Sequence, residues 1–396
     1  MSDITNSGPS ADDDLDPLFR RGPPTGHAPA GIPDLGTPSS GSGEEVAFAY
    51  TGRGRDIAGL AVQNALLNIV TLTLYRFWGR TRVRRHILAR TEINDEPMAY
   101  IGTGWELCKG FLIVLFGLFL PVFLIFTIGP YYLPYGLIWL SILVFEFGFF
   151  FLINYAVYAS RRYRFSRSTW RGIRFGMDGS AVEYALAAIG FGLLSGATLG
   201  WFTPAAQMRL TRRLWEETQY GARRFKAGAP GGRLAAGLYG PFAILWVVGG
   251  GAYVGFAVFM SVILPTLDID PSIPSWTMVL SIYGAALGAG LVIYLASLPY
   301  QAALLRRKAE IVGIDAARFR IAATAPGLFG LQVVNGLIVV FTLGFGQPIA
   351  TARTFRYIFN RLTSTGLIDF DAIRQSASTG PRSGEGLADA FDIGGF

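Results

Sequence analysis

Side chains suited to catalysis or metal binding are scarce in this sequence. It has one cysteine, Cys108, and two histidines, His27 and His86. A Cys/His zinc site needs more such ligands than these, and a disulfide within the chain needs a second cysteine. A Ser–His–Asp arrangement could form only around His86, which lies in a run of arginines. No dinucleotide-binding glycine motif, Walker loop or HExxH motif is present. We therefore expect no enzyme, no cofactor and no metal.

Glu146 is the acidic residue best placed for chemistry in an apolar environment, because it interrupts the run Leu-Val-Phe-Glu-Phe-Gly-Phe-Phe. A charge at the centre of a membrane costs at least about 2.5 kcal/mol. We expect Glu146 to face the interior of a helix bundle, where it could carry a proton or bind a cation. A protonated Glu146 that makes one hydrogen bond between helices is the alternative. Asn154 lies eight residues later, on roughly the same helix face, and is a second candidate.

Asn64 and Asn335 are further polar residues within apolar segments. Hydrogen bonds between membrane helices average about 0.6 kcal/mol, so structural cross-linking is the favoured role for both, with an intramembrane polar site as the alternative. Arginines recur in pairs after three apolar segments. These pairs are Arg82 with Arg85, Arg209 with Arg212, and Arg353 with Arg356. They are candidates to contact lipid headgroups or a small anion, whereas plain anchoring on the positive side of a membrane is the simpler interpretation.

The composition predicts a chain that resides in a membrane. Of its 396 residues 51% are hydrophobic and only 15% are charged, against roughly 25% charged in a soluble domain. The net charge of +7 is unevenly divided. Residues 1–45 hold eight acids and two bases, a net of −6, so the remainder carries +13. The polar, acidic N-terminus has no signal-peptide pattern.

The apolar runs predict two helical hairpins that each cross the membrane twice. Residues 110–128 lack any charge and are long enough, at about 28 Å as a helix, to span the hydrocarbon core. A turn follows, and residues 135–159 return. Residues 234–267 and 275–300 form the second pair, separated by a loop that holds two acids and two prolines.

Three further apolar segments are similar to one another. Thr71-Leu-Thr, Thr198-Leu-Gly and Thr342-Leu-Gly lie at offsets of 127 and 271 residues, and the arginine pairs follow at the same offsets. We therefore expect three internal repeats, at about 46–95, 173–222 and 317–366, within a membrane domain of residues 46–375. Short alternating stretches beside the repeats predict short cytoplasmic strands. Residues 1–45 and 376–396 are rich in Gly, Pro, Ser and Asp, and we expect them to be disordered tails.

At the same residues the sequence resembles the YjgN-like family of bacterial inner-membrane proteins, whose function is unknown. The resemblance covers roughly residues 46–372. It rests on Phe48 to Gly52, Asn64, Thr71-Leu72, Tyr75 to Trp78 with Arg82 and Arg85, and Tyr100 to Gly110. The first segment departs from the family pattern at Thr73, where Gly is usual, and at Phe77, where Pro is usual. The resemblance implies a location in the inner membrane, and it implies no reaction.

Charge predicts the topology, because cytoplasmic loops carry an excess of Lys and Arg. Residues 76–90, 161–174, 209–226 and 306–320 are basic, and the two spanning hairpins separate them in agreement with that rule. Both termini are then cytoplasmic. The repeated segments lie between basic stretches, so a single crossing would break the rule. We favour segments that re-enter on the same side or lie at the interface, over seven simple spans.

The sequence thus predicts an all-helical, multi-pass inner-membrane protein with membrane lipids as partners and no nucleic acid. Internal repeats, interrupted helices and Glu146 favour a transporter or channel for a lipid or a small anionic solute. The small number of intramembrane charges favours the alternative, a scaffold or assembly factor that transports nothing. An intramembrane enzyme is the third possibility, which the scarcity of His and Cys disfavours. A membrane protein partner and the oligomeric state stay open.

Overall fold

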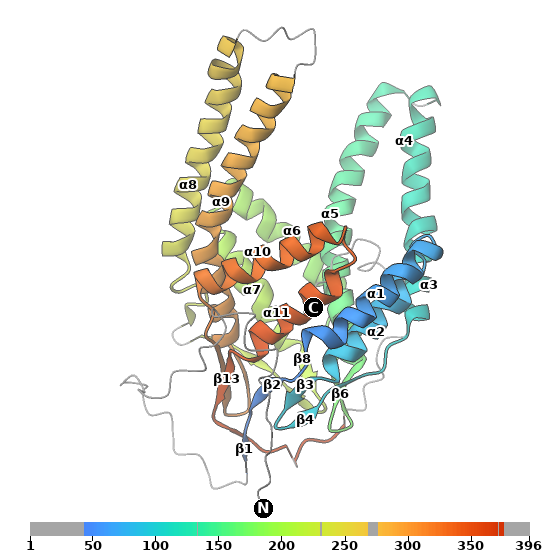
Figure 1. Cartoon of the computed structure of the whole chain (residues 1–396), viewed down its shortest axis with the longest axis vertical. Coiled ribbons are helices and arrows are strands. Elements are labelled where there is room, and N and C mark those ends of the chain that lie inside the picture. Colours follow the sequence, from blue (N-terminus) through green and yellow to red (C-terminus); the bar gives the residue numbers. More distant parts are fainter. Residues whose placement is uncertain (1–42, 133, 230–231, 268–275, 371, 376–396) are drawn as a thin grey trace, which may run out of the picture. The chain divides into compact units, whose positions relative to one another are not determined.

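The computed structural model describes residues 43–132, 134–229, 232–267, 276–370 and 372–375. The expected tails therefore lie almost wholly outside the described residues, except that Glu44 and Glu45 form a strand. Helices predominate, and the short strands gather at one end of the longest helices (Figure 1). The α-helices are α1 (Gly54–Val70), α2 (Arg76–Leu88), α3 (Gly104–Val114), α4 (Leu120–Tyr132), α5 (Tyr135–Ser166), α6 (Ala181–Ala197), α7 (Thr203–Glu216), α8 (Tyr239–Val258), α9 (Trp276–Glu310), α10 (Ala325–Phe341) and α11 (Gln347–Phe359).

Fourteen short strands form antiparallel ladders in the described part of the chain. They are β1 (Glu44–Glu45), β2 (Phe48–Tyr50), β3 (Thr91–Ile93), β4 (Glu96–Pro97), β5 (Ala99–Tyr100), β6 (Ser168–Trp170), β7 (Ile173–Met177), β8 (Thr218–Tyr220), β9 (Arg223–Arg224), β10 (Lys226–Ala227), β11 (Val312–Ile314), β12 (Ala317–Ile321), β13 (Leu362–Thr365) and β14 (Leu367–Ile368). The paired strands are neighbours in chain order, apart from β1 and β14, which join the two ends of the described chain.

Each helical segment is enclosed by two strands that pair with each other. β2 and β3 enclose α1–α2, β7 and β8 enclose α6–α7, and β12 and β13 enclose α10–α11. In the same way, β5 and β6 enclose α3–α5, and β10 and β11 enclose α8–α9. Because the enclosing strands are hydrogen-bonded partners, every segment leaves the strands and returns to the same ladder.

The three short segments have their elements at the offsets that the sequence shows. Helices α1, α6 and α10 each have 17 residues and begin at Gly54, Ala181 and Ala325. The ladders share one register, since Phe48 faces Ile93, Phe175 faces Tyr220 and Phe319 faces Ser364. We call α1–α2, α6–α7 and α10–α11 the short hairpins, because the two helices of each pack against one another.

The short hairpins turn through one backbone conformation. Leu72, Leu199 and Leu343 are left-handed, with φ of 48°, 50° and 51°. The threonine before each leucine donates from its hydroxyl to the carbonyl four residues earlier and accepts from the backbone N–H four residues later. These hydroxyls satisfy backbone groups that a helix end leaves unpaired.

Thr73 carries strain that its counterparts avoid. Its φ is 71°, whereas Gly200 and Gly344 hold φ of 90° at no steric cost. A β-branched residue in this region costs about 1–3 kcal/mol. Glycine avoids this cost, but its greater conformational freedom in the unfolded chain offsets up to about 1 kcal/mol of the gain. We expect Thr73→Gly to raise the free energy of unfolding by about 1 kcal/mol, measured by denaturation in mixed micelles. Gly344→Thr is the matched control and should lower it, while a loss of stability in Thr73→Gly would contradict this interpretation.

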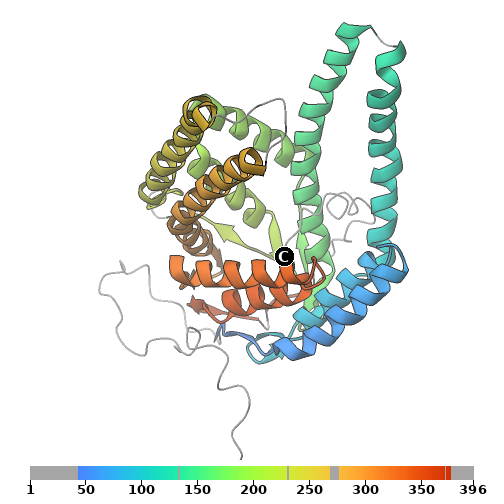
Figure 2. The same cartoon turned by 45° about the horizontal axis from the view of Figure 1, so that its top comes forward.

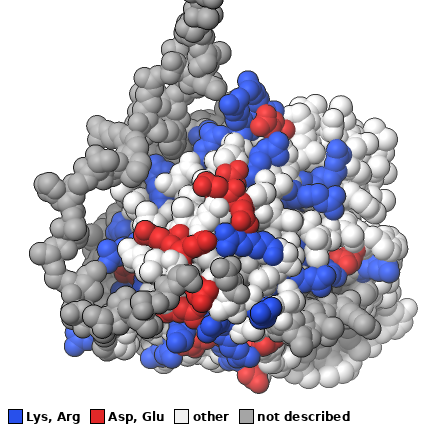
Figure 3. Space-filling model, turned by 90° about the horizontal axis from the view of Figure 1, so that it is seen from below, with Lys and Arg blue, Asp and Glu red and all other residues white. Residues whose placement is uncertain are grey.

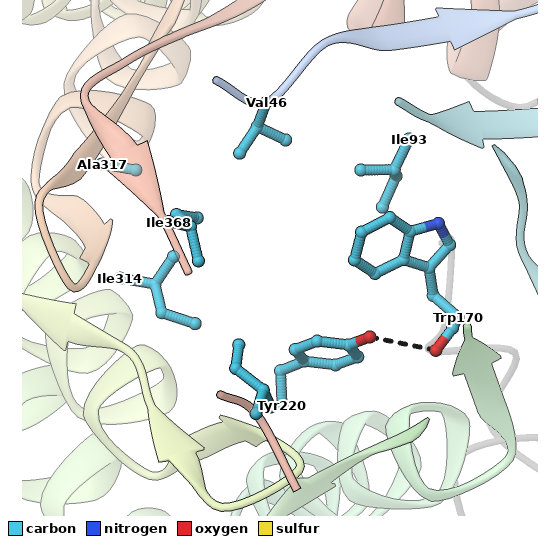
Figure 4. Close-up of a cluster of buried hydrophobic side chains, with 8 residues drawn as sticks. Val46, Ile93, Trp170, Tyr220, Ile314, Ala317 and Ile368 are labelled. Carbon is cyan, nitrogen blue, oxygen red and sulfur yellow. Dashed lines mark hydrogen bonds between the residues drawn. The ribbon is translucent and has the colours of Figure 1, made fainter. Parts of the chain in front are cut away.

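A hydrophobic core lies where the strands of all three short hairpins converge. Its buried members are Val46, Ile93, Trp170, Tyr220, Ile314, Ala317, Ile368 and Ile373. Figure 4 shows the labelled side chains, from several strands and from Val46 between β1 and β2, around a common centre. The Tyr220 hydroxyl donates to the Trp170 carbonyl at 3.0 Å. Phe48, Phe175 and Phe319, which are equivalent in the three ladders, pack around this strand core. Burial of this apolar surface stabilises the packing of the helical segments against one another.

Ion pairs cross-link the strands around that core. Arg171 contacts Glu96 at 3.0 Å and Glu44 at 3.4 Å, so it joins the β6–β7 turn to β4 and β1. Arg223, at the start of β9, reaches Asp315, in the β11–β12 turn, at 3.7 Å. Figure 3, which views this end of the molecule, shows basic and acidic side chains interleaved on its surface. Such pairs contribute little energy individually, but they fix which strands are neighbours.

Three helices are long and apolar enough to cross a membrane: Trp139–Ser166, Tyr239–Ile263 and Trp276–Glu310. The helical run α3–η1–α4, in which η1 is the π-helical turn Leu115–Phe119, lies beside α5 and completes the first of two long hairpins. The second is α8–α9 (Figure 2). The chain covers these helices sparingly, since 6%, 6% and 0% of the most apolar windows are buried. Their exposed faces are therefore available to lipid or to other proteins.

Candidate functional site

In two of the arginine pairs, the second arginine donates a hydrogen bond to a backbone carbonyl at the point where a strand leads into a helix. Arg356, on α11, donates to the carbonyl of Gly52, which leads into α1. Arg85, on α2, donates to the Gly102 carbonyl, which leads into α3, at 3.4 Å. Carbonyls equivalent to that of Gly52 are held in the other short hairpins, by Arg162 at Gly179 (3.4 Å) and by Arg306 at Ala323 (2.6 Å). These arginines position neighbouring helical segments against each other, which is a structural role that the sequence did not indicate.

The first arginine of each pair folds back over its own short hairpin. Arg82 donates to the Tyr75 hydroxyl at 2.8 Å and to Gln63 at 3.2 Å. Arg209 lies over the ring of Phe202, the residue equivalent to Tyr75, at 5.0 Å. Arg353 donates to Asn335 at 3.2 Å. The three pairs therefore stay on three separate short hairpins, and the structure does not bring them together into one site.

The remaining member of the pairs, Arg212, binds Glu216 one turn away at 2.7 Å. Two acids, Glu106 and Glu183, bind arginines outside the three pairs. Glu106 accepts from Tyr163 at 2.6 Å and Arg167 at 2.7 Å, and Glu183 accepts from Arg213 at 2.6 Å. Burial alone would lower the pKa of Arg213, but its bonds to Glu183 and Glu217 raise it above the usual value.

Asn64 and Asn335 make the same contact in the first and third short hairpins. Asn64 Nδ2 donates to the Gly79 carbonyl at 3.3 Å, and Asn335 Nδ2 donates to the equivalent carbonyl of Ala350 at 3.2 Å. Each bond joins the two helices of its hairpin. The bond does not depend on the glycine at position 79, because alanine occupies the equivalent position 350. This geometry is that of a structural cross-link.

Glu146 and Asn154 do not meet in a bundle interior. Glu146 is exposed on α5 rather than facing other helices of the chain, because the long hairpins are mostly uncovered. Asn154 donates to the Phe150 carbonyl of its own helix at 2.8 Å. The expectation that Glu146 points into the bundle is therefore wrong for the single chain, since the second long hairpin does not cover that face.

The tips of the short hairpins are apolar and exposed. Leu72, Leu199 and Leu343 expose 85%, 75% and 86% of their surface, and Phe341 beside the third tip exposes 82%. The second tip also touches the long hairpin α8–α9, where the Trp246 indole donates to the Leu199 carbonyl at 2.8 Å. The first arginine after the tip leucine is Arg76 in the first short hairpin, but Arg209 and Arg353, ten residues on, in the second and third.

Two cations near the strand end of the long hairpins are not among the residues predicted from the sequence. The guanidinium of Arg161, on α5, lies 4.5 Å from the centre of the Trp215 ring and 5.0 Å from that of Phe165. Its Nε and Nη2 atoms are buried, without a hydrogen-bond partner among the described residues. Lys308, on α9, is partly buried and close enough to Arg161 for the two charges to repel. Both residues read as ordinary basic flanks of apolar helices, so only their packing distinguishes them.

The sequence matches the model of the DUF898 family, described as bacterial protein of unknown function, over residues 45–390. The inner membrane protein YjgN of Salmonella typhimurium is 33% identical over 67 residues, which are 17% of this chain and 17% of that relative. The matched stretch thus spans only a small part of the relative's length. No solved structure matches the chain. Since the family model covers most of the sequence, from the strand β1 to beyond β14, the chain belongs to the DUF898 family.

Proposed function

We propose that the chain resides in the bacterial inner membrane, with the strand end and both termini in the cytoplasm. The relative's name, inner membrane protein YjgN, supports the location. The basic stretches 161–174 and 306–320, at the strand end of the long hairpins, support the orientation. In this topology the two long hairpins cross the membrane, and the far ends, where Tyr131 and Tyr132 are more than 80% exposed, face the periplasm.

The short hairpins, in the same proposal, are internal repeats that enter the membrane from the cytoplasmic side and return to it. The pairing of their enclosing strands supports this arrangement over seven spans, since a single crossing would separate strands that are hydrogen-bonded. Helix α2 carries arginines, whose transfer into hydrocarbon has a high free-energy cost. The exposed leucines at the tips would then lie among acyl chains, with the arginines behind them at the headgroups.

The activity that this geometry supports best is the transfer of an anionic lipid, or of a small anionic solute, across the membrane. The observation that carries it is the set of three apolar tips backed by arginines, at one end of long hairpins that the chain leaves uncovered. The proposal includes no catalytic step and no cofactor.

Reconstituted vesicles test this activity. We expect the purified protein to accelerate the movement of fluorescent phosphatidylglycerol between leaflets at least tenfold over protein-free vesicles, and phosphatidylcholine much less. The measurement is the fraction of label that a membrane-impermeant quencher reaches with time. Equal rates with and without protein would contradict the transfer activity.

A scaffold that transports nothing is the second candidate. The uncovered faces of the long hairpins favour it too, because such faces can pack against partner membrane proteins or a second copy. Cross-linking in native membranes separates the candidates. A scaffold yields defined cross-linked species through the long hairpins and vesicles without lipid transfer, whereas transfer by the purified protein alone identifies the first candidate.

A further inference from the structure

Arg161 and Lys308 bring two positive charges close together, and no described carboxylate is among the groups that act on them. The groups that act electrostatically on Arg161 are the phenols of Tyr184 and Tyr158, and the charged group that acts on Lys308 is Arg161. No carboxylate is among these groups in the described part of the chain. Buried charges in proteins are normally paired, since an isolated one loses its hydration without compensation. Two adjacent cations without an acid are therefore an exception that needs a counter-charge.

An acid bonded to Tyr158, which acts on Arg161, is already occupied. Glu217 accepts from the Tyr158 hydroxyl at 2.5 Å and from Arg213 at 2.9 Å. Its carboxylate thus neutralises Arg213 rather than Arg161. The aromatic rings of Trp215 and Phe165 lie against the Arg161 guanidinium and fix its plane. They offer a cation–π contact but no hydrogen-bond acceptor, so the buried Nε and Nη2 donors stay unsatisfied.

The depth of the two residues matches that of lipid headgroups. Arg161 lies about 40 Å along α5 from its first residue, and Lys308 lies nearly 50 Å along α9 from its start, by the rise of a helix. A hydrocarbon core of about 30 Å places both near the cytoplasmic interface in the proposed topology. A guanidinium with two free donors and a neighbouring ammonium suit the tetrahedral oxygens of a phosphate group.

We propose that Arg161 and Lys308 bind a phosphate group, held between the bases of the two long hairpins. The ligand is a phosphodiester of an anionic lipid headgroup or a free phosphate compound, which share this chemistry. The bound phosphate would join α5 to α9, which otherwise have few contacts. Binding is independent of transfer, so the site stands or falls separately from the transport activity proposed above.

The test uses the full chain in a neutral detergent and measures its melting temperature in the presence of three probes. These are inorganic phosphate, short-chain phosphatidylglycerol and short-chain phosphatidylcholine. A ligand that binds the folded state raises the melting temperature in proportion to the logarithm of its concentration above Kd. We expect phosphatidylglycerol, inorganic phosphate or both to raise it, and phosphatidylcholine to have little effect. A response to phosphatidylglycerol alone identifies a lipid site, and a response to phosphate identifies a site for soluble compounds.

Arg161→Gln and Lys308→Gln should each weaken the binding of the active probe at least tenfold. Arg55→Gln is the matched control, because Arg55 is 71% exposed, and it should bind as the wild type does. Without ligand, Arg161→Gln should melt at the same temperature as the wild type or higher, since it removes an uncompensated buried charge. A purely structural arginine would instead lower that temperature. If Arg161→Gln fails to fold, Lys308→Gln carries the test.

The proposal is overturned if no anionic probe stabilises the wild type, or if phosphatidylcholine stabilises it equally. It is also overturned if the variants at 161 and 308 bind as tightly as Arg55→Gln.

Discussion

Trp170→Ala should lower the free energy of unfolding by about 3–5 kcal/mol, the range for truncating a large buried aromatic. Trp170 is 2% exposed and lies at the centre of the strand core, with the Phe370 ring centred 4.8 Å away and edge-on. Its indole also donates to the Glu96 carbonyl at 3.2 Å. The substitution leaves a cavity among strands from all three ladders, as well as an unpaired carbonyl.

Trp276→Ala is the matched control, because Trp276 is 81% exposed at the start of α9. It should change stability by less than about 1 kcal/mol. Both variants are measured by denaturation in mixed micelles, with tryptophan fluorescence replaced by circular dichroism because each variant loses an indole. Similar losses of stability in the two variants would show that the strand core does not hold the helical segments together.

Gly221→Asn should lower the free energy of unfolding by about 2 kcal/mol or more, and the cause should be contact rather than backbone conformation. Gly221 has φ of 54°, and Asn94, at the equivalent place in the first ladder, has φ of 50°. Asparagine therefore tolerates this conformation here. A Cβ at position 221, however, would lie 2.4 Å from the Arg374 carbonyl oxygen, so the chain after β14 must move. Overpacking of this kind costs about 1–3 kcal/mol.

The reverse substitution, Asn94→Gly, supplies the comparison at the same backbone angles. It removes the bond from the Ala47 N–H to the Asn94 side chain, at 2.7 Å on the surface, and should cost about 1 kcal/mol. If Gly221→Asn is as stable as the wild type, the segment that carries Arg374 does not pack against the β8–β9 turn.

The positions of the turns and helices could be predicted from the sequence, because local rules determine them. Thr71, Thr198 and Thr342 at fixed offsets indicate three equivalent turns, and the structure has a turn at each. Asn64 and Asn335 were expected to cross-link helices, and each joins the two helices of its short hairpin. The long apolar runs predicted the long hairpins, of which three helices meet the requirements for a span.

What could not be predicted depends on contacts between distant parts of the chain. Glu45 looks like part of an acidic tail, but it pairs with Leu367 in the last strand. Arg85 and Arg356 look like anchors for lipid, yet they hold backbone carbonyls of other segments, at Gly102 and Gly52. Arg161 is indistinguishable from its neighbour Arg162 in the sequence, although only Arg162 finds a carbonyl at Gly179. Periodicity and charge carry no information about such partners.

The same-side return of the short hairpins is the central claim of this account, and cysteine accessibility tests it most directly. In a Cys108→Ser background, single cysteines replace Tyr132 at the end of a long hairpin, Leu343 at the tip of a short hairpin, and Glu92 and Thr363 in the strands that follow the first and third short hairpins. Intact cells are treated with a membrane-impermeant thiol reagent, and then with the same reagent after lysis. The account predicts labelling of position 132 in intact cells, of positions 92 and 363 only after lysis, and of position 343 in neither condition. Labelling of position 92 or 363 in intact cells would contradict it, because the strands on the two sides of a short hairpin would then face opposite sides of the membrane.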